Sequence, residues 1–280
     1  MDIYQIEQLI ELAVREDLGH GDITTDSLIP DSELASASII AKAHGIVAGI
    51  EVAKQVFLKV DPDTKVEILV KDGDSVKPGD VIARVQGRAS SILKAERLAL
   101  NFLQRLSGIA TETARYVQAV NGLPVSITDT RKTTPGLRLL EKYAVRMGGG
   151  KNHRMHLGDG VLIKDNHLAI LRRQGRSIKD IIAQVRQKIP PGTRIEIEVR
   201  TPQEAHEAAD AGADIIMLDN MSLDEMRRSV KLIAGRALVE ASGGMTLDKV
   251  RAVAETGVDL ISVGALTHSA KALDISLELD

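Results

Sequence analysis

The stretch from Arg194 to Asp219, RIEIEVRTPQEAHEAADAGADIIMLD, carries the pattern that decides the fold. Its two ends, at 194–199 and 214–219, are short apolar runs rich in Ile, Val and Leu, which are typical of β-strands. The segment between them, at 201–213, has the pattern of a helix. A strand, a helix and a second strand in this order predict a βαβ unit.

The same alternation continues on both sides of this stretch. Strand-like runs begin near 194, 214, 237 and 259, at steps of roughly twenty residues, which is the spacing of βα units. Together with earlier runs they make six predicted strands: VSITD (125–129), VLIKD (161–165), RIEIEV (194–199), DIIMLD (214–219), ALVEAS (237–242) and DLISVG (259–264). Six strands that end in polar or glycine residues favour a parallel barrel with its site at the carboxyl ends of the strands. A flat doubly wound sheet is the alternative, but no GxGxxG follows a strand to open a helix. Because fewer than eight units are visible, we expect a short or open barrel.

The N-terminal part has a different pattern. Residues 3–17 show helical periodicity, and 35–88 contain short strand-like runs separated by turn residues. Residues 89–120 are predicted to form a helix with a break near Ser107-Gly108. A stretch within this part, 70–85, superficially resembles a biotinyl or lipoyl carrier hairpin, but no lysine occupies a carrier-like tip, so a structural hairpin is favoured.

These patterns predict two domains. We expect an N-terminal α/β domain over 1–107 and a barrel over 108–268. The tail, 269–280, alternates like a strand and is expected to return to the N-terminal sheet.

Composition narrows the possible functions. The 280 residues are 44% hydrophobic and 27% charged, which is ordinary for a soluble globular protein. Aromatic residues are only 2%, with no Trp, which disfavours base stacking on nucleic acid. The absence of Cys excludes disulfides and thiolate chemistry. No signal peptide or membrane-spanning run is visible, so we expect a cytoplasmic protein that binds neither membranes nor nucleic acid.

The stretch 129–167 is strongly basic although the whole chain carries a net charge of −3. Its cations are Arg131, Lys132, Arg138, Lys142, Arg146, Lys151, Arg154 and Lys164, accompanied by His153, His156 and His167. A local excess of this kind indicates a site for a small, highly charged anion. For the three cations spaced along the helix after Pro135, a solvated basic face is an equally good interpretation. The glycines at 148–150 are expected to bring the backbone close to a ligand, and His167 to cap a helix.

Acidic residues and glycine turns follow the predicted strands. The acids at the strand ends are Asp129, Asp165, Glu198 and Asp219. One such acid alone would more often cap the next helix, but four that converge with a basic cluster favour binding of hydroxyls or a divalent metal. Glu196 is expected on the opposite face of its strand, which favours Glu198. The turns Ser242-Gly243-Gly244 and Gly264-Ala265 follow the last two strands, where they form either simple tight turns or a phosphate site.

Three sequence blocks resemble the quinolinate phosphoribosyltransferase family. They are TRKTTPG, GGGKNHR and VLIKDNH, in this order between 130 and 167. Further similarity lies in EDLGHGDITT at 16–25, ERLALNF at 96–102, LSGIAT at 106–111, IEIEV at 195–199, MLDN at 217–220 and SGG at 242–244, so the resemblance covers nearly the whole chain. It departs from the family pattern at Met147, His156 and Gly158, none of which removes a required charge. The resemblance implies an N-terminal α/β sandwich domain followed by an open, TIM-like α/β barrel.

The family resemblance also implies roles for individual residues. Quinolinate would be bound by Arg97, contributed across a dimer interface, and by Arg131, His153, Arg154 and Lys164. Phosphoribosyl diphosphate would be bound by Thr130, Lys132, Glu198, Asp219, Ser242, Gly243, Gly244, Val263, Gly264 and Ala265. The catalytic set would be Lys132, Lys164, Glu198 and Asp219, with Mg²⁺ held by Glu198 and Asp219 directly or through the substrate. Arg105, in a setting similar to that of Arg97, is not expected to bind substrate.

The implied reaction is phosphoribosyl transfer to quinolinate with decarboxylation, which gives nicotinate mononucleotide, CO₂ and diphosphate in de novo NAD biosynthesis. The protein would be a homodimer with shared sites, or a higher oligomer. Two alternatives are weighed against this prediction. One is a related transferase for a different ring, such as the molybdenum-transport-linked homologues, and the other is a non-catalytic barrel that binds a phosphorylated ligand.

Overall fold

The computed structural model describes residues 3–280, and its backbone divides into two compact units. The first unit comprises the described residues through Ala114 together with Thr134–Gly149 and Ser269–Asp280. The second unit comprises Arg115–Thr133 and Gly150–His268. The boundary predicted between 107 and 108 therefore falls inside one long helix, α4 (Ala89–Ala119), rather than in a linker.

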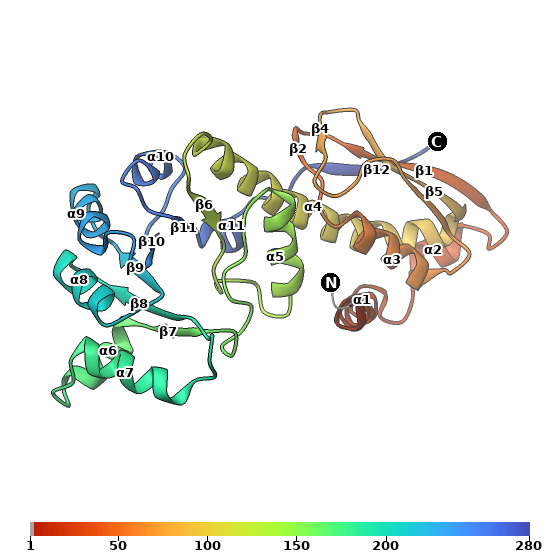
Figure 1. Cartoon of the computed structure of the whole chain (residues 1–280). Helices are drawn as coiled ribbons and strands as arrows, with labels where there is room; N and C mark the ends of the chain where they lie inside the picture. The colour runs from red at the N-terminus through yellow and green to blue at the C-terminus, as the bar shows by residue number, and fades with distance from the viewer. Residues whose placement is uncertain (1–2) are drawn as a thin grey trace. The chain divides into compact units, whose positions relative to one another are not determined.

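The first unit is built on a four-stranded antiparallel sheet (Figure 1). The strands lie in the order β12 (Ile275–Leu279), β1 (Leu34–Ala41), β5 (Val81–Arg88) and β3 (Lys65–Ile68). Side chains alternate across β1, so that Ala37, Ile39 and Ala41 are fully buried in the core. The C-terminal strand β12 pairs with β1, with Ala37 opposite Leu279.

Helices complete the first unit. They are α1 (Ile3–Leu18), α2 (Ile23–Leu28), α3 (Ile50–Val60), α4 and α5 (Arg138–Met147), and two short strands, β2 (Gly45–Ile46) and β4 (Ser75–Val76), pair with each other. The predicted helices at 3–17 and 89–120 are confirmed. The predicted break in α4 is wrong. A Cβ atom at Gly108 would lie 2.0 Å from the carbonyl oxygen of Lys271, so the glycine makes room for a crossing segment within a continuous helix.

The second unit is a six-stranded parallel sheet, and all six predicted strands are present. They are β6 (Ser126–Thr128), β7 (Val161–Ile163), β8 (Ile195–Val199), β9 (Ile215–Asp219), β10 (Leu238–Ser242) and β11 (Leu260–Ser262). Their order is β6-β11-β10-β9-β8-β7, so β11 pairs with β6 as the last strand of a barrel pairs with the first. Within residues 3–280, β6 and β7 do not pair with each other, which makes the barrel open, as the sequence predicts. Lys151 forms an isolated bridge with Thr128 of β6 and so lies at this opening.

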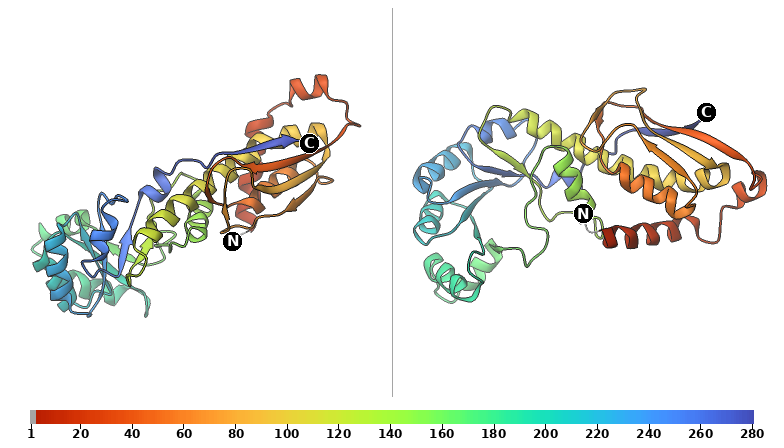
Figure 2. Two further views of the ribbon diagram at one scale, coloured as in Figure 1. Left: turned by 90° about the horizontal axis from the view of Figure 1, so that it is seen from above. Right: turned by 45° about the vertical axis from the view of Figure 1, so that its right-hand side comes forward.

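Helices cover the outside of the barrel sheet, as Figure 2 shows from two directions. They are α6 (Asp165–Arg172), α7 (Ile178–Lys188), α8 (Pro202–Asp210), α9 (Leu223–Ile233), α10 (Val250–Ala254) and α11 (Ala265–His268). Local sequence fixes where several begin, because Ser177 and Ser222 form capping boxes and the Thr201 side chain caps α8. Since all six strands are parallel, their carboxyl ends and the loops that follow lie at one edge of the sheet.

A helix that crosses a membrane must be both long and apolar. Among residues 3–280, none is both long enough and apolar enough to cross a bilayer.

Candidate active site

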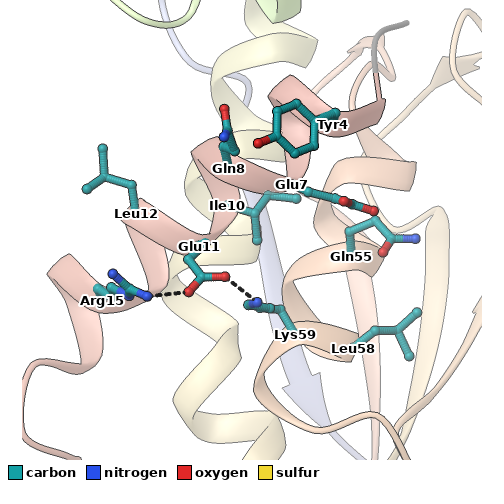
Figure 3. Close-up of a pocket in the computed structure, with 10 residues that line it drawn as sticks. All are labelled: Tyr4, Glu7, Gln8, Ile10, Glu11, Leu12, Arg15, Gln55, Leu58 and Lys59. Carbon is teal, nitrogen blue, oxygen red and sulfur yellow. Dashed lines mark hydrogen bonds and ion pairs between the residues drawn. The ribbon is translucent and has the colours of Figure 1, made fainter.

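A hollow of the first unit lies between α1 and α3 and has a volume of about 620 Å³ (Figure 3). Its charged side chains are mostly paired with one another, since Glu11 contacts both Arg15 and Lys59 at 2.5 Å. None of the residues that the sequence predicts for the site lines this hollow. The functional site therefore has to be sought in the second unit.

Three carboxylates converge at the carboxyl edge of the barrel sheet. Glu198 is the penultimate residue of β8, Asp219 is the last residue of β9, and Asp165 begins the helix after β7. Partial burial, with Asp219 and Asp165 close by, raises the pKa of Glu198 above its ordinary value. The structure therefore brings these acids together, as the sequence predicts, into an arrangement that favours a cation or a shared proton.

Arg200 joins this acidic group although sequence reasoning missed it. Its guanidinium contacts Asp165 at 2.7 Å and lies 3.7 Å from Asp219. Its position two residues beyond Glu198, just after a strand end, is the signal that could have identified it. Arg200 fixes the orientation of two acids whose loops follow different strands.

The loop after β10 packs tightly against the end of β9. Gly243 has a φ of 100°, and a Cβ atom there would lie only 2.3 Å from Oδ1 of Asn220. Asn220 itself is left-handed, with a φ of 53°, and its side-chain amide donates to Oδ1 of Asp219 at 2.9 Å. Its backbone N–H donates to the carbonyl of Ser242. Asn220 therefore links the rim acid to the glycine turn, while Gly244 faces open space.

The loops after β6 and β11 also meet. A Cβ atom at Gly264 would lie 3.1 Å from Cδ of Lys132, so the small residue leaves room for the lysine side chain. The hydroxyl of Thr267 donates to the carbonyl of Lys132, and the N–H of Lys132 donates to Oγ1 of Thr130. Val263 is buried and bonds to β6, whereas Ala265 begins α11. Lys132 thus lies beside the second predicted glycine turn.

Two arginines form the cationic part of the site. Burial, together with the neighbouring charge of Arg131, lowers the pKa of Arg154. The Nε atom of Arg131 is buried and has no hydrogen-bond partner among residues 3–280, while Arg154 donates to the carbonyl of Gly160 at 3.1 Å. Two close guanidinium groups, one with an unsatisfied donor, favour an anion between or beside them.

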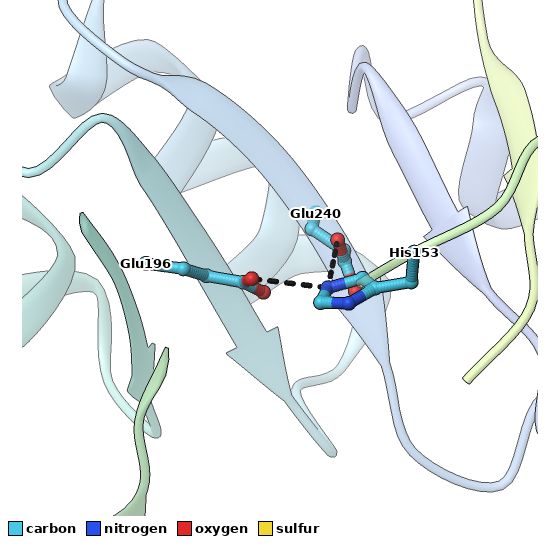
Figure 4. A group of neighbouring side chains, drawn as sticks. All are labelled: His153, Glu196 and Glu240. Atoms are coloured by element: carbon cyan, nitrogen blue, oxygen red, sulfur yellow. Dashed lines mark ion pairs between the residues drawn. The ribbon is translucent and has the colours of Figure 1, made fainter. Parts of the chain in front are cut away.

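His153 lies inside the barrel rather than at its rim (Figure 4). Its Nε2 atom is 3.0 Å from a carboxylate oxygen of Glu196 and 3.6 Å from one of Glu240. The expectation that Glu196 faces away from Glu198 is wrong, because side chains two residues apart on a strand share a face. Glu196, Glu240 and His153 line a cavity of about 400 Å³ that also reaches Arg154.

Asp129, another of the predicted rim acids, is fully buried. Its carboxylate accepts hydrogen bonds from the side-chain amide of Asn152 and from the backbone N–H of His153. It therefore fixes the loop that carries His153 and Arg154. The prediction that Asp129 lies among the rim acids is wrong, because its burial depends on contacts with a loop more than twenty residues away in sequence.

Lys164 is exposed at the end of β7. Its N–H donates to Nδ1 of His167, which confirms the expectation that His167 caps α6. Gly148 is needed for packing in the first unit, since a Cβ atom there would lie 2.3 Å from the carbonyl oxygen of Ala110. This packing accounts for Gly148, while the expected approach of the glycine turn to a ligand stays a prediction.

The helical cations of the first unit have different environments. Lys142 is fully buried, so a solvated face is the wrong interpretation for it, whereas Arg146 is exposed over Tyr143. Arg105 contacts the buried Glu141 at 2.8 Å and donates to the carbonyl of Ala270. Arg97 is 64% exposed on α4. The Arg105 guanidinium is thus engaged within its own unit, and the expectation that Arg105 does not bind substrate stays a prediction.

Comparison with known proteins places these features in a family. The N-terminal domain model of quinolinate phosphoribosyl transferase matches residues 22–107, and the C-terminal domain model matches 109–278. A Bacillus subtilis protein named probable nicotinate-nucleotide pyrophosphorylase (carboxylating) is 44% identical over 100% of this chain and 95% of its own length. A mitochondrial quinolinate phosphoribosyltransferase (decarboxylating) from Nicotiana tabacum is 45% identical over 99% of this chain and 83% of its own length.

A solved structure agrees with the sequence matches. The crystal structure of NadC from Streptococcus pyogenes superposes with a TM-score of 0.95 at 43% identity, covering 100% of this chain and 98% of that one. Both domain models, the curated relatives and the shared fold lead to one conclusion: the chain belongs to the quinolinate phosphoribosyltransferase family.

Proposed function

We propose that this protein transfers a phosphoribosyl group from phosphoribosyl diphosphate to quinolinate and releases CO₂ and diphosphate. The observation that carries the proposal is the Arg131–Arg154 pair, in which the buried Nε atom of Arg131 has no hydrogen-bond partner in the part of the chain that the structure describes. Quinolinate is a dianion of the size and charge that such a pair would bind. The names of two relatives that are 44% and 45% identical over 100% and 99% of this chain point to the same reaction.

The chain's residues can be assigned to the two substrates by their positions. Arg131, Arg154 and Lys164 would hold the carboxylates, and the turns at Gly243 and Gly264 would receive the phosphate of the sugar donor. Lys132, beside Gly264, would balance the charge of the leaving diphosphate. Glu198 and Asp219 would lie near the ribose and stabilise the positive charge that develops at C1.

The decarboxylation needs little from the protein beyond orientation. When the ring nitrogen bonds to C1 of the ribose, diphosphate leaves with the bonding electron pair and the ring becomes cationic. The carbon–carbon bond to the 2-carboxylate can then break, leaving its electron pair on C2 beside that cation, where a proton is taken up. The arginine pair would hold the remaining carboxylate through these steps.

The rim acids also fit a divalent cation. Glu198 and Asp219 are close enough to raise the pKa of Glu198, and carboxylate oxygens are the ligands that Mg²⁺ prefers. When bound, Mg²⁺ would neutralise charge on the diphosphate. We therefore include Mg²⁺ in the proposed reaction, held by these two acids directly or through the substrate.

The proposed reaction is tested by incubating the purified protein with quinolinate, phosphoribosyl diphosphate and Mg²⁺. We expect nicotinate mononucleotide and CO₂ in equal amounts, and loss of turnover in EDTA. Turnover of a different heteroaromatic acid but not of quinolinate would contradict the assigned substrate. Equal rates with and without EDTA would remove the metal from the proposal.

We further propose that the active protein is a homodimer whose sites share Arg97. Its guanidinium is 64% exposed, and its nearest carboxylate, that of Glu96, is 4.0 Å away. An arginine so exposed on the first unit is available to a second copy of the chain, and a two-fold dimer would use the same surface twice.

Subunit mixing tests this arrangement. Arg97→Ala and Glu198→Ala should each be nearly inactive, yet a mixture allowed to exchange subunits should recover to about a quarter of wild-type activity. The recovery follows because half the dimers would be hybrids with one intact site each. If exchange is verified by mass spectrometry and no activity returns, Arg97 does not act in the neighbouring subunit's site.

A further inference from the structure

The cluster of His153, Glu196 and Glu240 has a role in the second unit that neither the family match nor the rim chemistry explains. Glu240 is fully buried on β10, and within the described residues neither of its carboxylate oxygens has a hydrogen-bond partner at normal geometry, although the Ser262 hydroxyl is close enough to affect its charge. Oε1 of Glu196 is likewise buried without one. Figure 4 shows both carboxylates directed at the ring of His153.

Two buried carboxylates this close cannot both carry a full charge without compensation. Burial, and then the charge of Glu196, raise the pKa of Glu240 to about 7, while His153 and the hydroxyl of Ser262 act in the opposite direction. Either a proton or a metal cation could compensate. The distances alone would allow a metal, since one ligand atom from each of the three residues lies within 4.8 Å of the others.

The tautomer of His153 decides between these possibilities. The Nδ1 atom accepts a hydrogen bond from the backbone N–H of Arg154 at 2.9 Å. The proton of a neutral imidazole must then be on Nε2, the atom that faces Glu196 at 3.0 Å. An Nε2–H group can donate to a carboxylate but cannot coordinate a cation. The geometry therefore favours a proton on the acid pair over a metal ion.

The same histidine connects the interior to the anion site. Its backbone N–H donates to Asp129, and its ring accepts from the backbone of Arg154. The orientation of the ring is thus fixed from the barrel interior by Glu196 and from the loop by Arg154. If the ring rotated, the backbone N–H of Arg154 would lose its acceptor. Arg154, whose side chain is close to that of Arg131, would then shift.

We propose that Glu196 and Glu240 are positioning residues that hold one proton between them, keep His153 in its Nε2–H tautomer and thereby place Arg154 for the substrate anion. The acid that carries the proton contributes no charge, so a single carboxylate remains to accept from His153. The role in substrate binding rests on the proposed function, whereas the tautomer does not. Other charged groups around the cavity are Lys151, Arg154, Asp159 and Arg194.

The kinetic test compares Glu196→Gln and Glu240→Gln with Glu67→Gln, which alters an exposed glutamate on β3. Glu196→Gln should raise KM for quinolinate about tenfold, because its charge-assisted hydrogen bond is lost, with KM for phosphoribosyl diphosphate changed less than about twofold. In the wild type, KM for quinolinate should rise between about pH 6 and pH 8, on either side of the Glu240 pKa of about 7, as the shared proton leaves, and Glu240→Gln should flatten that rise. Equal effects on both KM values, or an unaltered pH profile, would overturn the positioning role.

The second test does not depend on activity. In protein with ¹⁵N-labelled histidine, the resonances missing from His153→Gln identify this ring, and their shifts report which nitrogen is protonated. We expect the Nε2–H form at neutral pH in the wild type. An Nδ1–H form, an imidazolium, or one tightly bound Zn²⁺ or Mn²⁺ per chain with shifted His153 resonances would overturn the proposal. If quinolinate is not turned over, the proposed function fails while this test remains valid.

Discussion

Glu196 and Glu198 are two residues apart on one strand, yet they have different environments. Glu198 lies at the rim with Asp219 and Asp165, whereas Glu196 lies deeper, where it contacts His153 and, through it, Glu240. Two residues along a strand correspond to roughly 7 Å, which here separates a group open to ligand from one enclosed by the sheet. Depth in the barrel, more than residue type, therefore decides whether an acid can act on a substrate.

The largest effect should come from the rim. Glu198→Gln should lower kcat/KM by about two to three orders of magnitude, because it removes a charge placed for the transition state. It should not lower the melting temperature, since the pKa of Glu198 is raised and its charged form costs stability. Steady-state kinetics and thermal denaturation measure both quantities, with the exposed Glu207→Gln as the control. If Glu198→Gln kept the wild-type kcat/KM, Glu198 at the rim would be no more important for the reaction than an acid in the interior.

Substrate choice tests the arginine pair that borders both regions. Nicotinate lacks the 2-carboxylate, so one of the two half-buried guanidinium groups would be left without its partner. We expect kcat/KM for nicotinate to be about one to two orders of magnitude below that for quinolinate. Arg131→Lys should narrow this ratio, because lysine cannot reproduce the planar fork. Comparable values for the two acids in the wild type would show that a diacid is not what the pair recognises.

Asn220 offers a smaller change at the rim without altering a charged residue. Asn220→Asp retains a side chain that tolerates a positive φ but loses the amide that donates to Asp219. KM for phosphoribosyl diphosphate should rise about tenfold while KM for quinolinate changes little. Asn121→Asp, at an exposed position after α4, is the matched control. Equal increases in both KM values would indicate general distortion of the rim.

The smallest effect concerns the stability of the interior. The folded state raises the pKa of Glu240 from its ordinary 4.5 to about 7, so the folded protein binds more protons than the unfolded chain in that interval. This group's contribution to stability therefore falls as the pH rises from 4.5 to about 7 and is constant above. Gln cannot ionise, so the Glu240→Gln variant does not lose stability in this way as the pH rises. The melting temperature of the variant should exceed that of the wild type by several degrees near pH 8 and by less near pH 5. A lower melting temperature at pH 8 would contradict the assignment of a proton to this acid.

Much of the fold could be predicted from local patterns. The six barrel strands follow from apolar runs at a regular spacing, and the long helix before them follows from its periodic leucines. The break predicted at Gly108 failed because a glycine in a helix can mark either an end or a close crossing. The crossing segment, near Lys271, is more than 160 residues away in sequence, so no local pattern reports it.

By itself, the sequence determined the repeat of parallel strands, the family, and the acids and glycine turns at the strand ends. These features depend on residue order along one strand or one loop, and parallel strands place their carboxyl ends at one edge whatever else the chain does. Only the tertiary structure decided which polar groups are enclosed. It buried Lys142, Asp129 and Glu240, set Arg200 across two loops, and turned His153 inward. Burial and partner distance arise from segments remote in sequence, and they determine whether a side chain holds the protein together or meets a ligand.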